Sequence, residues 1–211
     1  MPAIYSCAYF PNIAYVSSML FQDSIYIERW ENYIRQSYRS RCLINGANGI
    51  LPLSIPVKGG RKKILIKDTR IVSDQSWIDQ HLRSIMSAYG NAPFYDHYID
   101  DLHMFFEQKH TFLYDLSIES MTLCLKMMNL KIKWKETEEF IHEYETGEND
   151  FRNEFNAKNR EDLPKFFIPQ KYIQLFGKQF AVNLSILDLI MCEGPQASSI
   201  LQGSYLSGLN N

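Results

Sequence analysis

The chain has 211 residues, of which 45% are hydrophobic and 14% aromatic, which is enough for a substantial core and excludes a disordered chain. Its 22 basic and 24 acidic residues lack the basic excess typical of nucleic-acid-binding proteins. No apolar run approaches the roughly 20 residues of a transmembrane helix, and the N-terminus shows no signal-peptide pattern. We expect one domain over residues 1–211.

The cysteines predict a reducing compartment. The four of them are widely scattered and form no CxxC pair: Cys7, Cys42, Cys124 and Cys192. This spacing argues against a disulfide framework and against a structural zinc site. We therefore expect a cytoplasmic protein without a metal. No basic residue near Cys7 lowers its pKa, so a packed cysteine is favoured over a nucleophile there.

The chain opens with a strand–turn–helix–strand pattern. Residues 2–9 predict a strand, and residues 25–27 predict a second. Between them, apolar residues recur at helical spacing over residues 12–22, where Asn12 is available as the N-cap. Strand–turn–helix openings are common in nucleotide-binding sheets, although no glycine-rich fingerprint is present.

A hairpin is the clearest local signal. Residues 38–44 and 50–57 are strand-like, and the Asn/Gly-rich residues 45–49 supply the positive φ angles of a tight reversal. Residues 64–66 and 69–72 predict one or two further short strands. Residues 2–72 are thus predicted to be strand-rich and to form a mixed sheet.

The remainder is predicted to be mainly helical. Apolar periodicity indicates helices within residues 73–130. The polar residues 137–160 are expected to be the most mobile part of the fold. Residues 171–205 predict a C-terminal helical segment, in which Ser185 caps a helix and Asp188 completes a variant of the capping box. The fold class is therefore α+β, with an N-terminal half similar to α/β proteins.

Four groups of residues agree with a known family in order, spacing and type. They are Ala8-Tyr9-Phe10-Pro11 with Tyr15; Glu31-Asn32-Tyr33-Ile34-Arg35-Gln36-Ser37-Tyr38-Arg39-Ser40-Arg41-Cys42; Leu53-Ser54-Ile55-Pro56-Val57-Lys58-Gly59 with Trp77, His81, Ala88-Tyr89 and Ala92-Pro93-Phe94-Tyr95; and Asn183-Leu184-Ser185-Ile186-Leu187-Asp188-Leu189 with Glu193-Gly194-Pro195. Over residues 8–201 the chain resembles the WbqC-like family of bacterial surface-polysaccharide loci. The resemblance implies a role in building or decorating a glycan such as O-antigen or capsule. Many members carry His-Gln-Pro where this chain has Ser6-Cys7-Ala8, which implies a branch with different or lost chemistry.

Arginines near the first hairpin strand are candidate anion ligands. Even numbers of positions separate Arg35, Arg39 and Arg41. In an extended strand their side chains could therefore project from one face toward a phosphate or nucleotide diphosphate. The alternatives are solvation or salt bridges to nearby acids: Asp23, Glu28 and Glu31. With the family context, we predict a substrate-binding cleft lined by Tyr9, Arg35, Ser37, Arg41 and Lys58.

Trp77 and His81 are four residues apart on a predicted helix, so they share a face. We predict that Trp77 binds substrate and that His81 is the catalytic general base. The alternative for His81 is a half-buried helical histidine that bonds a carbonyl. His97 and Asp101 have a metal-ligand spacing, but solvent-facing charges explain them better.

Two functions follow. The first is a small transferase that moves an acyl or aminoacyl group to an activated or amino sugar. The second is a non-catalytic protein that binds a sugar phosphate or nucleotide sugar in the same pathway. The expected partners are a phosphorylated or nucleotide-linked sugar and an acyl or aminoacyl donor, with no nucleic acid as main ligand. The sequence leaves open the cofactor, the sugar, the transferred group and the oligomeric state.

Overall fold

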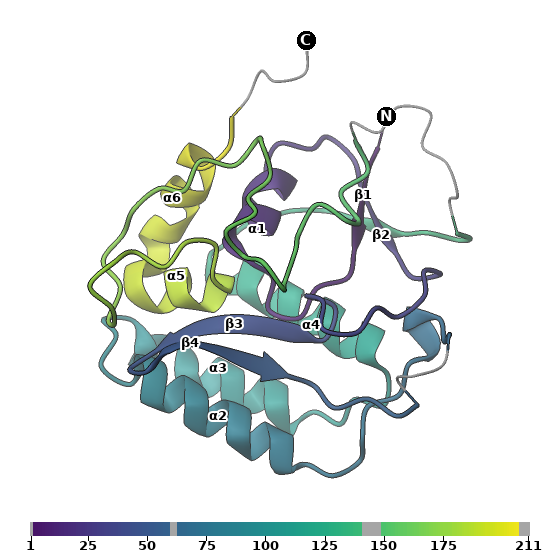
Figure 1. Cartoon of the computed structure of the whole chain (residues 1–211), viewed down its shortest axis with the longest axis horizontal. Coiled ribbons are helices and arrows are strands. Elements are labelled where there is room, and N and C mark those ends of the chain that lie inside the picture. Colours follow the sequence, from purple (N-terminus) through teal and green to yellow (C-terminus); the bar gives the residue numbers. More distant parts are fainter. Residues whose placement is uncertain (1, 60–62, 141–148, 207–211) are drawn as a thin grey trace.

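The computed structural model describes residues 2–59, 63–140 and 149–206, and it confirms the α+β class (Figure 1). The opening pattern forms as predicted: β1 (Ala3–Ser6), α1 (Ile13–Met19) and β2 (Ile25–Glu28). Both strands run parallel, in a register that aligns Ser6 with Glu28. The Asn12 side chain caps α1 by accepting a 2.8 Å hydrogen bond from the backbone N–H of Tyr15.

The predicted hairpin forms a sheet of its own. β3 (Arg41–Gly46) pairs antiparallel with β4 (Gly49–Ser54), and Gly49 supplies a positive φ of 105° at the turn. The strands of residues 2–72 therefore lie in two sheets, and the prediction of a single mixed sheet was wrong. The parallel sheet instead gains β5 (Lys135–Glu136) beside β2.

Residues 64–72 hold a short 3₁₀ helix, η1 (Ile66–Asp68), in place of the expected strands. Their strand-like contacts are isolated bridges, such as Val57 with Ile71. This bridge does not extend into a ladder, because Pro56 accepts from the Val72 N–H at 2.9 Å but has no N–H to donate in return.

Helices pack on both sides of the hairpin. Figure 1 shows β3 and β4 crossing the middle of the molecule, with α2 and α3 on one side and α5 and α6 on the other; β3 contacts both α2 and α5. The helices and the remaining 3₁₀ turn are α2 (Ser76–Tyr89), α3 (Tyr95–Glu107), α4 (Leu113–Met127), α5 (Ile186–Glu193), η3 (Gly194–Gln196) and α6 (Ala197–Gly203). Within the described ranges, none of them has the length and apolar character needed to cross a membrane.

The start of α5 is joined to the start of the chain. The backbone N–H of Ile13 bonds the carbonyl of Leu184 at 3.0 Å, and the N–H of Ile186 bonds the carbonyl of Pro11 at 2.8 Å. Ser185 caps α5 as predicted, accepting from the N–H of Leu187 at 3.3 Å. The two ends of the sequence therefore build one buried junction.

The long connection from β5 to α5 contains no α-helix or strand in its described parts. It nevertheless supplies core residues, since Phe151 and Phe167 are buried. Residues 141–148 of the predicted mobile segment lie outside the described residues, and its mobility stays a prediction.

Candidate functional site

The carboxyl ends of the parallel strands carry polar side chains. β1 ends at Ser6 and β2 at Glu28, in register. Asp150 lies beside β1 through a parallel bridge to Ile4, and the N–H of Phe151 bonds the carbonyl of Ile4 at 2.8 Å. Side chains from three distant segments therefore meet at the sheet edge where open α/β sheets usually bind ligands.

Arg39 is held in a buried ion pair at this edge. Its Nε donates to Glu31 Oε1 at 2.8 Å, and its Nη2 donates to Glu31 Oε2 at 2.5 Å and to Ser6 Oγ at 2.6 Å. Burial opposes the charge, but the hydrogen bonds and charge of Glu31 raise the pKa of the Arg39 guanidinium overall. The structure thus bears out, for Arg39, the salt bridge that the sequence left as an alternative.

A second buried arginine lies beside the first. Arg152 donates to Asp150 Oδ1 at 2.8 Å and to Asp150 Oδ2 at 2.5 Å, and its Nη1 is 3.5 Å from Glu28 Oε2. Burial raises the pKa of Asp150, but Arg152 outweighs it and the pKa is lowered. Glu28 also accepts hydrogen bonds from the Trp30 N–H and the Thr137 hydroxyl, at 2.8 and 2.7 Å. Both arginines are therefore fixed in place and charged.

A cleft of about 770 Å³ opens over these arginines, and we call it the strand-end cleft. Its lining combines residues that follow β2 with residues of the connection to α5. Five lining residues are basic and two are acidic: Arg35, Arg39, Arg152, Lys158 and Lys165, against Glu154 and Asp162. Three of the bases have no ion-pair partner among the described residues: Arg35, Lys158 and Lys165. Arg39 and Arg152 are compensated by buried carboxylates, so the positive charge available in the cleft comes from Arg35, Lys158 and Lys165 at its rim.

Two of the predicted ligands, Arg35 and Ser37, line this cleft. They lie in a turn, where the Ser37 hydroxyl donates to the Ile34 carbonyl at 2.6 Å and Gln36 has a positive φ of 56°. β3 begins only at Arg41, so strand alternation does not govern Arg35. The sequence pointed to Arg35 by its residue type, but no local pattern predicted which residues would lie beside it in the cleft.

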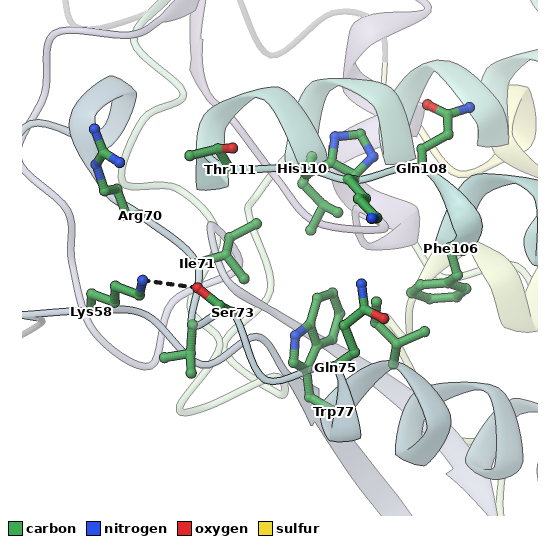
Figure 2. Close-up of a pocket in the computed structure, with 14 residues that line it drawn as sticks. Lys58, Arg70, Ile71, Ser73, Gln75, Trp77, Phe106, Gln108, His110 and Thr111 are labelled. Carbon is green, nitrogen blue, oxygen red and sulfur yellow. Dashed lines mark hydrogen bonds between the residues drawn. The ribbon is translucent and has the colours of Figure 1, made fainter.

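The other predicted ligands lie elsewhere. Arg41 is half-buried at the start of β3, where its Nε donates to Ser54 Oγ at 3.1 Å. Lys58 and Trp77 line a separate pocket, the Lys58 pocket, which shares no residue with the strand-end cleft (Figure 2). Tyr9 is fully buried. The expectation of one cleft for Tyr9, Arg35, Ser37, Arg41 and Lys58 was wrong, because Tyr9 is packed in the core and Lys58 lines a different pocket from Arg35 and Ser37.

His81 lies in the core, where only 2% of its surface is exposed. Its Nδ1 is 2.9 Å from the Tyr9 hydroxyl, and its ring lies edge-on to Trp77 with centroids 5.2 Å apart. Burial lowers the pKa of His81 to about 4, although a hydrogen bond to the Ser54 backbone opposes this shift. His81 lines neither cleft nor Lys58 pocket. The geometry therefore favours the structural alternative over general-base catalysis.

Asp188 has a role that the capping prediction missed. Its carboxylate is buried and accepts from the Tyr89 hydroxyl at 2.9 Å, the Tyr172 hydroxyl at 2.6 Å and Gln174 Nε2 at 3.1 Å. Burial raises the pKa of Asp188, and these three donors offset the rise only in part. The carboxylate anchors the connection to α5, and its long-range donors left no local pattern in the sequence.

The cysteines are all free and buried. Burial raises the pKa of the Cys7 thiol far above its ordinary value, which fits a packed cysteine. Across the described ranges, no three His, Cys, Asp or Glu side chains are grouped to hold a metal ion. Asp101, one of the residues with metal-ligand spacing, is 3.4 Å from Lys126 in an exposed ion pair.

Together these features define an α+β protein with a cationic cleft at the carboxyl ends of a small parallel sheet. The chain belongs to the WbqC-like protein family, whose model matches residues 7–158. No curated protein and no solved structure matches the chain significantly. The matched range includes the hairpin and the start of the connection that closes the cleft.

Proposed function

We propose that the strand-end cleft binds a phosphorylated or nucleotide-linked sugar used in bacterial surface-polysaccharide synthesis. The observation that carries this proposal is the excess of basic side chains in the cleft, three of them without an ion-pair partner among the described residues. Phosphate groups bind such cations through charge-assisted hydrogen bonds, and arginine can form two at once. The family resemblance supports the polysaccharide pathway.

The buried ion pairs beneath the cleft support this use. Arg39 and Arg152 already have carboxylate partners, so they give the cleft a rigid floor and leave the binding charge to the rim. Arg35 and Lys158 are exposed at the rim and are free to reach a phosphate. Phe155 and Phe166 add an apolar part to the lining, against which a sugar or base can pack.

A second candidate is transfer of an acyl or aminoacyl group to the sugar in the same cleft. Two exposed carboxylates, Glu154 and Asp162, favour it, because they line the cleft beside the cations. Either could accept the proton of a sugar hydroxyl or amine as that group attacks an activated acyl donor. The new ester or amide bond forms while the bond between the acyl carbon and its carrier breaks, and the carrier leaves with that electron pair. We propose a cytoplasmic location for either function, which fits the four free cysteines.

The test is a calorimetric titration with sugar 1-phosphates, nucleotide sugars and the matching neutral sugars. Nucleotide sugars or sugar phosphates are expected to bind saturably, and the neutral sugars are not. Stabilisation against heat should accompany binding, by about 2.7 kcal/mol at a hundredfold excess over the dissociation constant. Equal binding of neutral and phosphorylated sugars would overturn the proposal.

Variants locate the binding. Arg35→Gln and Lys158→Gln should each weaken binding about tenfold, the value of one charge-assisted contact. The matched control is Arg83→Gln, which removes an exposed arginine from α2, outside the cleft. If transfer occurs, Asp162→Asn or Glu154→Gln should lower turnover while affinity stays nearly unchanged. Unchanged affinity in both cation variants would contradict the site.

A further inference from the structure

The Lys58 pocket is a second cavity, of about 250 Å³, on another face of the molecule. Residues that lead into α2 form one side of it, and the connection between α3 and α4 forms the other. In Figure 2, Gln75 and Trp77 lie along the first side and Gln108, His110 and Thr111 along the second. Lys58, residues 70–78 and residues 106–116 are separate in the sequence, and together they line one small space.

The charges in this pocket have one sign. Its lining includes four basic side chains and no aspartate or glutamate: Lys58, Arg70, Lys109 and His110. Lys58 Nζ donates to the Ser73 hydroxyl at 3.0 Å, and neither Lys58 nor Lys109 has an ion pair within the part of the chain described. Arg70 is less available to a ligand, because its guanidinium stacks over the Phe112 ring, with Cζ 5.1 Å from the ring centroid.

His110 adds a buried polar atom at the wall. Its side chain is 7% exposed, and its Nε2 has no hydrogen-bond partner in the described structure. Glu119 on α4 is the acidic group near it, with an oxygen 3.5 Å from that nitrogen. The Ser73 hydroxyl and the His110 imidazole therefore line the same pocket as the ammonium groups of Lys58 and Lys109, which have no ion pair among the described residues.

The floor of the pocket is aromatic. Trp77 and Phe106 are both buried and lie edge to face, with ring centroids 6.3 Å apart. The rim offers polar side chains that can donate or accept hydrogen bonds: Ser73, Gln75, Gln108 and Thr111. An apolar floor with a few convergent polar and charged groups is the usual build of a small-molecule site.

We propose that the Lys58 pocket is a second ligand site, for a small organic anion that carries one phosphate or carboxylate on a compact ring or acyl body. The ammonium groups of Lys58 and Lys109 bind the anion, and the body packs against Trp77. The volume admits one such molecule and is too small for a nucleotide-linked sugar. The proposal for the Lys58 pocket does not depend on the function proposed for the strand-end cleft.

The test uses fluorine NMR of the whole chain labelled with 5-fluorotryptophan. The chain has three tryptophans, so Trp30→Phe and Trp134→Phe assign two resonances and leave the third to Trp77 without changing the buried pocket. Phenyl phosphate and benzoate are titrated separately, to distinguish a phosphate from a carboxylate ligand. We expect at least one of them to shift the Trp77 resonance saturably.

Exposed lysines provide the variants. In Lys58→Gln/Lys109→Gln, the affinity read from the Trp77 resonance should fall at least tenfold, whereas Lys171→Gln, outside the pocket, should leave it unchanged. The proposal is overturned if neither anion moves the Trp77 resonance at about 10 mM, a concentration chosen to detect weak millimolar binding. It is also overturned if the double variant binds as tightly as the natural chain. Arg35→Gln tests the strand-end cleft alone, so failure of one site is distinguishable from failure of the other.

Discussion

Two buried polar regions of this protein use opposite electrostatic solutions. At the strand ends, Arg39 and Glu31 are both almost fully buried, and each compensates the charge of the other. On the buried face of α2, His81 has a tyrosine hydroxyl and a backbone group as partners and no carboxylate among the described residues, so burial keeps it neutral. The first region keeps its charges inside, and the second excludes charge.

The difference indicates where function is best sought. The buried Arg39–Glu31 ion pair and the buried neutral His81 ring already bind partners within the protein and stabilise the fold. Surface cations such as Arg35 and Lys58, which have no carboxylate partner within the described ranges, are available for a ligand. The predictions below test this division, from the largest expected effect on stability to the smallest.

Arg39→Met should have the largest effect. It leaves Glu31 buried without its partner, which typically costs about 3–5 kcal/mol of the free energy of unfolding. Urea denaturation followed by circular dichroism measures the loss. Arg39→Met combined with Glu31→Met should recover most of it, because no unpaired charge remains. A double variant as unstable as the single one would contradict the account of the pair.

His81 should give the protein a distinct pH dependence. Its pKa is about 4 in the folded state and about 6.5 in the unfolded state. The folded pKa is the lower one, so stability is complete above about pH 6.5 and falls as the pH drops toward 4, by about 2–3 kcal/mol. In His81→Phe this part of the fall should vanish. Unfolding titrations between pH 4 and 7.5 measure both; parallel curves would refute a neutral buried imidazole.

Tyr172→Phe should cost less. It removes the 2.6 Å hydrogen bond to the Asp188 carboxylate but keeps the ring, so we expect a loss of about 1–3 kcal/mol. Tyr26→Phe is the matched control, because the Tyr26 hydroxyl has no hydrogen bond among those described. The same urea titration serves both variants. Equal losses would show that the contact with Asp188 adds no stability.

Arg35→Gln should change the free energy of unfolding by less than about 0.5 kcal/mol, as expected for an exposed side chain. Its effect should appear in the affinity for sugar phosphates. Arg41→Gln sharpens the contrast, because Arg41 is half-buried and lies outside the strand-end cleft. Titration calorimetry should show weaker binding for Arg35→Gln only. Weaker binding for both would restore the single cleft expected from the sequence.

Local patterns predicted most of the elements. Helical periodicity, the Asn12 and Ser185 caps and the Asn/Gly turn place the helices and the hairpin near their observed positions. Which strands pair was not visible locally. β5 is two exposed residues, Lys135 and Glu136, and no periodicity distinguishes so short a strand from a loop.

The candidate site was predicted only in part. Arg35 and Ser37 stood out by residue type and family resemblance, and the structure places them in one cleft. Their neighbours Arg152 and Lys158 come from a segment whose polar composition predicted exposure and mobility. Its few aromatic residues are what pack it against the sheet, since Phe151 stacks on Tyr5 with ring centroids 4.7 Å apart. Such a long-range contact leaves no local signal.

The junction between α1 and α5 has a consequence for how the chain is made. Its hydrogen bonds join Pro11 and Ile13 to Ile186 and Leu184, so α1 gains these partners only after a long further stretch of chain has been synthesised. Contacts between residues so far apart slow folding, because a long loop must close before they form. During translation the early strands therefore remain without their final cover. Nascent chains arrested before Leu184 should depend on chaperones, and emergence of α5 and α6 from the ribosome should let α1 acquire its native contacts.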